Sequence, residues 1–257
     1  MAQTHADDWD QHWDDFAEVA EQNPAQDFRR RLVQEHLGVV PRGAHLVDFG
    51  SGQGDLVQDL ARLHPDAEVL GIEYSRKGVD IGARKVPRAT FLQRDLTDPE
   101  PAPPQFVGWA THATCAEVLE HVDDPVALLR HALVYCAPGC RLVITVPGGP
   151  RSAFDVHIGH RRHYDAVSLR RLLLDAGLRV ESVEAVGFPF FNLYRLVVVA
   201  RGRKLAEDVS VLHGGGVSPL AAAVMRVFHS LLSLPLRGQR WGWQMVAVAV
   251  WPDPAAA

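Results

Sequence analysis

Short apolar runs alternate with segments of helical periodicity from His45 to the end of the chain. Apolar runs bounded by turn-forming residues are typical of buried strands, and they predict strands at 45–49, 67–74, 89–96, 107–116, 141–147, 178–187 and 243–251. The intervening periodic segments predict helices at 54–64, 76–85, 117–136 and 168–176. Alternating strands and helices predict an α/β fold with a largely parallel, Rossmann-like sheet covered by helices on both faces.

The first 37 residues have a different pattern, which is helical throughout. Trp9, Trp13 and Phe16 recur at helical spacing among acidic residues. Asn23 followed by Pro24 predicts the start of a second helix, because asparagine is a good N-cap and proline is tolerated at the first helical position. We therefore expect residues 1–37 to form a helical arm or lid.

A second helical segment interrupts the alternation before the last strand. Residues 188–205 and 218–236 both predict apolar helices, separated by the glycine-rich stretch 213–216. The sequence thus predicts an apolar insertion at 188–239, inside an α/β domain made of 38–187 plus 240–257. Such apolar stripes are usually core or dimer contacts. A lid over an apolar ligand and peripheral contact with a membrane are the alternatives, and the membrane contact is the less favoured one.

Composition narrows the range of partners. The chain of 257 residues carries 26 basic and 31 acidic residues, and 47% of its residues are hydrophobic. This is an ordinary globular balance with a net charge of −5. A nucleic-acid groove needs a positive field, so we expect a small-molecule ligand rather than nucleic acid. The oligomeric state is left open.

The compartment is predicted from the cysteines and the first residues. Three cysteines are too few, and odd in number, for a disulfide framework. The initial segment has neither the basic nor the apolar region of a signal peptide, and no apolar run is long enough to span a bilayer. We therefore expect a cytoplasmic protein.

The strongest candidate site is the glycine loop Val47–Asp55, VDFGSGQGD, directly after the first strand. Gly50, Gly52 and Gly54 let a ligand approach the backbone closely, and the following helix presents free amides at its N-terminus. Open α/β sheets bind ligands at the carboxyl ends of their strands. The loop therefore predicts a cofactor site.

Two carboxylates fall at neighbouring strand ends. Glu73 ends the second strand, where a carboxylate accepts hydrogen bonds from ribose hydroxyls. Asp95 ends the third strand, within reach of an adenine amino group. The spacing of the glycines is G-x-G-x-G, which differs from the G-x-G-x-x-G of nicotinamide-dependent dehydrogenases. This difference favours another nucleoside cofactor.

With these motifs in order, the chain resembles the class I S-adenosylmethionine-dependent methyltransferases. The segments that carry the resemblance are VDFGSGQGD, GIEYS, QRDLTD, CAEVLEHVDDP and LVITVP. They cover roughly residues 30–187 and the final strand. The resemblance implies a seven-stranded sheet with a reversed last strand and S-adenosylmethionine as the cofactor.

The resemblance also implies a set of cofactor-binding residues. The loop glycines and Ser51 would face the methionine part, Glu73 would hold the ribose, and the backbone near Cys115 would contact the cofactor amino group. The whole implied set is Asp48, Gly50, Ser51, Gly52, Gly54, Glu73, Tyr74, Asp95, Leu96 and Cys115.

A candidate metal site follows the fourth strand. Glu117, Glu120 and His121 stand at positions i, i+3 and i+4, which share one face if the segment is helical. Two carboxylates and an imidazole can hold a divalent cation, with His160 as a further ligand. The E-x-x-E-H form is similar to metal-using methyltransferases of small-RNA ends and of the ubiquinone pathway. The alternative is an acidic first turn that only favours the helix dipole.

The last candidate is the histidine-rich stretch after the fifth strand. His157, His160 and His163 lie in a loop that the resemblance places over the transferred methyl group. Histidine suits general-base chemistry near neutral pH and also ligates metals. We expect at least one of them to be catalytic, His160 first. The alternative is a surface segment whose histidines pack and cap.

Together these features predict a methyltransferase that acts on an oxygen of a small, rather hydrophobic metabolite, with a divalent cation as a second cofactor. Methylation of nitrogen or carbon is less favoured. The alternatives are an RNA 2′-O-methyltransferase, a nicotinamide-dependent oxidoreductase and a non-catalytic cofactor-binding scaffold.

Overall fold

The computed structural model describes residues 23–211, 219–234 and 241–253. Their strands form one sheet in the order β3-β2-β1-β4-β5-β7-β6, in which β7 runs antiparallel to both neighbours. The strands are β1 His45–Phe49, β2 Glu68–Glu73, β3 Thr90–Gln93, β4 Ala110–Ala116, β5 Cys136–Pro147, β6 Arg179–Val186 and β7 Gln244–Val250. The predicted sheet with its reversed last strand is confirmed.

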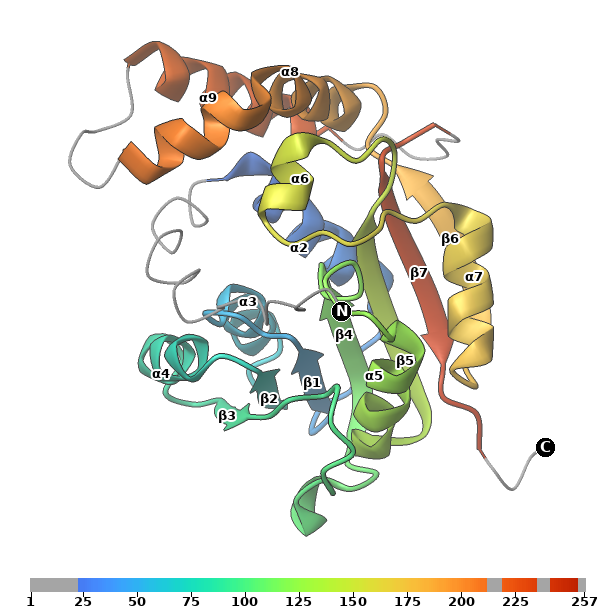
Figure 1. Cartoon of the computed structure of the whole chain (residues 1–257). Helices are drawn as coiled ribbons and strands as arrows, with labels where there is room; N and C mark the ends of the chain where they lie inside the picture. Colours follow the sequence, from blue (N-terminus) through green and yellow to red (C-terminus); the bar gives the residue numbers. More distant parts are fainter. Residues whose placement is uncertain (1–22, 212–218, 235–240, 254–257) are drawn as a thin grey trace, which may run out of the picture.

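Helices cover both faces of this sheet (Figure 1). On one face, α5 Pro125–Ala132 and α7 Ala166–Asp175 pack against the strands. On the other face lie α2 Pro24–His36 and α3 Asp55–Leu63, and α4 Arg76–Lys85 packs against β2 and β3. The fold therefore has three layers, as the alternating pattern predicts.

Alternate side chains of the central strands divide the core into two halves. In β5, Leu142 and Ile144 pack in the cluster that contains Leu128 of α5, whereas Val143 packs in the cluster that contains Leu60 of α3. All three β5 residues are fully buried. A strand buried on both faces reads as a continuous apolar run, which is why the sequence locates it so clearly.

The insertion forms two further helices, α8 Phe190–Val211 and α9 Pro219–Leu232, which pack against each other. Figure 1 shows them in orange at one end of the molecule, beside the short helix α6 Ala153–His157. Helix α8 packs on α6, and α9 packs on α2. Within the described residues, no helix combines the length and apolar character needed to cross a membrane.

The N-terminal helix begins where its cap predicts. The side chain of Asn23 accepts a hydrogen bond from the Ala25 amide at 2.9 Å, and Pro24 is the first helical residue. Leu32 and Val33 of α2 are buried in the half of the core that also contains Leu60 of α3, so α2 is part of the core. The predicted helical residues Trp9, Trp13 and Phe16, and the stretch 213–216, lie outside the described residues.

One predicted helix is wrong over half its length. The segment 117–124 is an irregular turn, and α5 begins only at Pro125. The reason is local. The Asp124 side chain accepts a hydrogen bond from the Ala127 amide and so sets the start of the helix. Glu117 has a φ of 57°, which is incompatible with a helix that would begin directly after β4. Glu117, Glu120 and His121 therefore share no helical face.

Candidate active site

The glycine loop lies at the carboxyl end of β1, where the loops that follow the parallel strands meet. The amides of Gly50 and Ser51 both donate to the Ile72 carbonyl, which turns the chain sharply after β1. Gly50 has a φ of 72°, and a Cβ there would lie 2.3 Å from a methyl group of Val118. Only glycine fits this position, so the loop comes close to the turn after β4.

Glu73 braces the loop from the end of β2. It is buried, and its carboxylate accepts hydrogen bonds from the Gly52 amide at 2.8 Å and the Ser75 amide at 2.9 Å. Each carboxylate oxygen has two lone pairs, so both oxygens can accept further bonds from ribose hydroxyls. Glu73 thus fixes the loop and can hold a nucleoside at the same time.

Asp48 lies beneath the loop, fully buried. The Thr114 hydroxyl donates to its carboxylate at 2.6 Å. Burial raises the pKa of Asp48 to about 7; the Thr114 hydrogen bond lowers it and the nearby Glu73 carboxylate raises it further. Asp48 is therefore an interior residue that links β1 to β4 through Thr114.

The other residues expected at the cofactor surround the same edge of the sheet. The Asp95 carboxylate accepts from the amide and hydroxyl of Thr97, at 2.8 and 2.6 Å. Leu96 is buried, Tyr74 is 48% exposed after β2, and Cys115 is buried near the end of β4. The Ser51 hydroxyl is buried and makes no hydrogen bond within the described structure. A buried hydroxyl without a partner in the glycine loop fits a polar ligand such as S-adenosylmethionine.

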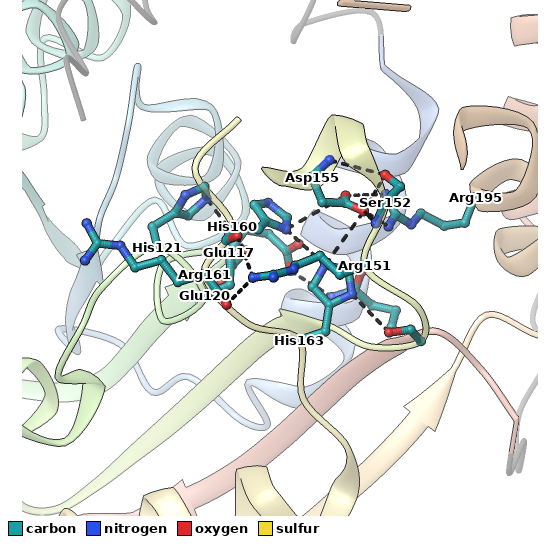
Figure 2. A network of polar contacts seen from close by, with 12 residues as sticks. Glu117, Glu120, His121, Arg151, Ser152, Asp155, His160, Arg161, His163 and Arg195 are labelled. Carbon is teal, nitrogen blue, oxygen red and sulfur yellow. Dashed lines mark hydrogen bonds and ion pairs between the residues drawn. The ribbon is translucent and has the colours of Figure 1, made fainter. Parts of the chain in front are cut away.

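The turn after β4 and the loop after α6 bring three candidate metal ligands together. One ligand atom each from Glu120, His121 and His160 lies within 4.8 Å of the others (Figure 2). Glu120 is fully buried, and neither of its oxygens makes a hydrogen bond within the described structure. Burial raises the pKa of this carboxyl well above its usual range, and the neighbouring Glu117 adds to the rise. Buried carboxylates are normally paired or bound to metal, so the cluster fits a divalent cation.

The two segments are held together by backbone contacts. The Arg161 amide donates to the Glu120 carbonyl at 2.8 Å, and the Tyr164 hydroxyl donates to the Leu119 carbonyl at 3.0 Å. Arg162 donates to the carbonyls of Val122 and Asp123. The arginines of the histidine-rich loop therefore fasten it to the β4–α5 turn.

His163 sets the tautomer of His160. Its Nδ1 lies 3.1 Å from the Gly149 carbonyl, which can only accept, so this nitrogen carries the proton. In the neutral ring, His163 Nε2 then accepts from His160 Nδ1 at 3.1 Å. His160 is left with Nε2 as its lone-pair nitrogen, the form that binds metal.

Burial decides the protonation state of these rings. Burial lowers the pKa of His160 to about 2, assisted by the nearby His121, and burial also lowers the pKa of His163. Both rings are therefore neutral at physiological pH. His157 is exposed at the last position of α6 and belongs to neither histidine cluster of the described structure.

Glu117, which the sequence predicts as a metal ligand, contacts two other side chains in the structure. Its Oε2 lies 3.0 Å from Arg29 Nε, and its Oε1 accepts from Gln244 at 2.7 Å. The sequence pattern does not indicate Arg29 and Gln244, because α2 and β7 lie far from Glu117 along the chain. Only the fold brings these partners together.

The structure also contains a buried ion pair, between Arg195 and Asp155, that the sequence does not predict. Arg195 of α8 donates two hydrogen bonds to the Asp155 carboxylate, at 2.9 and 2.8 Å, and Ser152 donates to the same group (Figure 2). Burial alone would raise the pKa of Asp155, but these donors hold it below its usual range. Asp155 lies close to His160 and His163, yet its oxygens are already occupied by these donors.

Solved structures share the fold. A phosphoethanolamine N-methyltransferase 2 from Haemonchus contortus, solved with S-adenosyl-L-methionine, matches with a TM-score of 0.64 and 15% identity, over 98% of this chain and 62% of that chain. A (4+2) cyclase matches with a TM-score of 0.62 and 19% identity, over 95% of both chains. At such identities the likeness concerns the fold alone.

Sequence relatives point to one family. The ubiquinone biosynthesis O-methyltransferase of Acinetobacter baylyi is 30% identical over 155 residues, which cover 59% of this chain and 62% of the relative. The match thus spans less than two thirds of that relative. A family model described as a methyltransferase domain matches residues 19–183, more than half of the chain. The predicted membership is confirmed: the chain belongs to the methyltransferase-domain family.

Proposed function

We propose that this chain transfers a methyl group from S-adenosylmethionine to a hydroxyl oxygen of a small apolar acceptor, with a divalent cation at Glu120, His121 and His160. The main support for the cation is the Glu120 carboxyl group, which is fully buried and makes no hydrogen bond within the described structure, with the imidazoles of His121 and His160 close by. The name of the Acinetobacter relative supports oxygen as the methylated atom.

The cofactor supplies an activated methyl group when it is bound, so the protein mainly has to align the two partners. The glycine loop, in which Gly50 and Gly52 have positive φ values, accommodates the methionine part, and Glu73 orients the ribose. Asp95 and Leu96 border the adenine. These roles follow from the position of each residue at the carboxyl edge of the sheet.

The acceptor hydroxyl must lose its proton during the transfer. A histidine whose pKa is about 2 holds a proton too weakly to be an effective base near neutral pH, which argues against His160 as the general base. A cation held by His160, His121 and Glu120 would instead lower the pKa of a hydroxyl that it contacts. His163 then acts as a positioning residue, because it fixes the tautomer of His160.

The helices around this edge support an apolar acceptor. Leu193, Leu196 and Val197 of α8 are exposed, and α6, which bears the adjoining loop, packs on α8. We assign the insertion 188–239, through helices α8 and α9, as a cover on the acceptor side of the domain 38–187 plus 240–257. Within the predicted arm 1–37, helix α2 is part of the core. Nucleic acid is the less favoured acceptor.

A matched pair of substitutions in one strand tests the cofactor site. Glu73→Gln removes an acceptor from the loop and the ribose, so we expect S-adenosylhomocysteine to bind about 10-fold to 100-fold more weakly, a loss of about 1–3 kcal/mol. Glu68→Gln at the exposed start of β2 serves as the control and should bind as the wild type does. Isothermal titration calorimetry measures both. Equal affinities for the two variants would contradict the assignment of Glu73.

Transfer itself is tested with alkylated phenols and catechols as acceptors. We expect methyl ethers to form, at a rate that EDTA lowers at least about 10-fold and that added cation restores. Transfer that EDTA does not affect would remove the cation from the proposal. Binding of NADH in place of S-adenosylhomocysteine would favour the oxidoreductase, and binding without transfer to any acceptor would favour the scaffold.

A further inference from the structure

Arg29 is a cation that the fold itself places beside the candidate metal site. It extends from α2, its Nε lies 3.0 Å from Glu117 Oε2, and its side chain is 13% exposed. It also donates to the Gln244 side chain at 3.0 Å, and its guanidinium lies 5.6 Å from the centre of the Phe191 ring. A guanidinium held by a carboxylate, an amide and an aromatic face is fixed in place.

Arg29 affects which groups the Glu117 carboxylate can bind. One of its carboxylate oxygens faces Arg29, and the other accepts from Gln244 at 2.7 Å. Its amide donates to the Thr145 carbonyl at 2.9 Å, so its backbone is anchored to β5. Glu117 is accordingly outside the cluster in which the ligand atoms of Glu120, His121 and His160 converge.

The remaining donors differ in kind from a site with two carboxylates. Two imidazoles and one carboxylate form the ligand set of catalytic zinc sites and of non-haem iron sites, which keep positions open for water or substrate. Mg²⁺ prefers an octahedron of oxygen ligands and binds imidazole poorly. Removing one carboxylate from the set therefore changes which cation is favoured.

Building on the cation of the proposed function, we propose that Arg29 determines the metal specificity of this site. By pairing with Glu117, it leaves Glu120, His121 and His160 as a three-ligand site that selects Zn²⁺, Co²⁺ or Fe²⁺ over Mg²⁺. Without Arg29, the Glu117 oxygen that it pairs with can become a fourth ligand, and the site gains a second carboxylate, the kind of ligand that Mg²⁺ prefers.

The test compares metal binding in the full-length wild type and three variants, by calorimetry with Zn²⁺ and Mg²⁺ and by the visible absorption of bound Co²⁺. The wild type should bind one Zn²⁺ or Co²⁺ and bind Mg²⁺ at least about 100-fold more weakly. Glu120→Gln should weaken Zn²⁺ binding about 100-fold, whereas Glu117→Gln should change it less than about threefold. Arg29→Met should strengthen Mg²⁺ binding at least about 10-fold and shift the Co²⁺ spectrum.

Arg30→Met is the matched control for Arg29→Met. Arg30 is the residue after Arg29 in α2, and it pairs with Asp59 and Asp27 and not with Glu117. It should leave both metal affinities unchanged. Thermal unfolding of each variant shows whether it folds, and Glu117→Gln tests the proposal independently of any change in α2.

Two results would overturn the proposal. Loss of Zn²⁺ binding in Glu117→Gln as severe as in Glu120→Gln would show that Glu117 is a ligand despite Arg29. Mg²⁺ binding that Arg29→Met leaves unchanged would show that Arg29 does not control selectivity. Either result leaves the cation of the proposed function in place, whereas a wild type that binds none of these metals yet binds S-adenosylhomocysteine would remove that cation as well.

Discussion

At the scale of single residues, Asp48 makes the stability of the protein depend on pH. Its folded pKa of about 7 lies above the value of about 3.9 expected in the unfolded chain. Because the folded state binds this proton more tightly, the stabilisation is complete below about pH 4 and is lost as the pH rises through about 7. A fully buried carboxylate next to Glu73 thus weakens the fold at neutral pH.

Asp48→Asn should remove this dependence, because asparagine still accepts from Thr114 and cannot ionise. Relative to the wild type, the variant should gain about 2.6 kcal/mol of unfolding free energy as the pH rises from about 5 to about 8. Urea denaturation of the apoprotein at the two pH values measures the difference. The exposed Asp98→Asn is the control. A wild type whose stability does not fall over this range would show that Asp48 is not the titrating group.

The sequence predicts the position of a site residue well when that position depends on the neighbouring residues along the chain. The glycine loop follows β1 and Glu73 ends β2, as the pattern predicts, whereas Asp95 lies two residues after β3, which ends at Gln93 and is shorter than predicted. Glu120, His121 and His160 also come together as expected, although by way of an irregular turn. Glu117 could not be assigned in this way, since its partners Arg29 and Gln244 come from the second helix and the last strand.

At the scale of elements, one buried ion pair fastens the insertion to the histidine-rich loop. Asp155 is in α6, Arg195 is in α8, and both are almost completely buried. The Asp155 carbonyl accepts from the His160 amide at 2.8 Å, so the pair connects α8 to a candidate metal ligand. A buried carboxylate that loses its partner is left uncompensated, which makes this contact costly to break.

Arg195→Met should therefore destabilise the protein by about 3–5 kcal/mol. Adding Asp155→Asn should recover part of that loss, because the uncompensated charge is removed. Arg226→Met, at an exposed position of α9, should change stability by less than about 0.5 kcal/mol. Urea denaturation of the single and double variants gives the coupling between the two residues. A coupling near zero would mean that the pair does not join α6 to α8.

An element is predictable from the sequence when residues close along the chain determine where it begins and ends. Helix α4 occupies the predicted residues 76–85, and α2 begins at its predicted cap, because short-range capping fixes both. The predicted helix 117–136 begins only at Pro125, because Glu117 has a positive φ and Asp124 provides the cap, and its sequence pattern shows neither feature clearly. Strand β5 begins at Cys136, five residues before the predicted start at 141, where the apolar pattern is too weak to show it.

At the scale of the whole molecule, the proposed cofactor site consists of segments that only the folded sheet brings together. The loops after β1, β2, β3 and β4 all contribute residues, and the strands before them share one sheet. No short piece of the chain contains this site. A ligand that binds there binds the folded state alone, so its binding free energy adds to the stability of the sheet.

S-adenosylhomocysteine at about 100 times its dissociation constant should therefore add about 2.7 kcal/mol to the stability. For a chain of this size, such a gain should raise the midpoint of thermal unfolding by about 5–10 °C. Differential scanning calorimetry measures the shift, and Glu73→Gln should show a smaller one at the same ligand concentration because its binding is weaker.

NADH is the decisive comparison, since the G-x-G-x-G loop disfavours a dinucleotide. A midpoint that rises with NADH and not with S-adenosylhomocysteine would assign the strand-end site to a different cofactor.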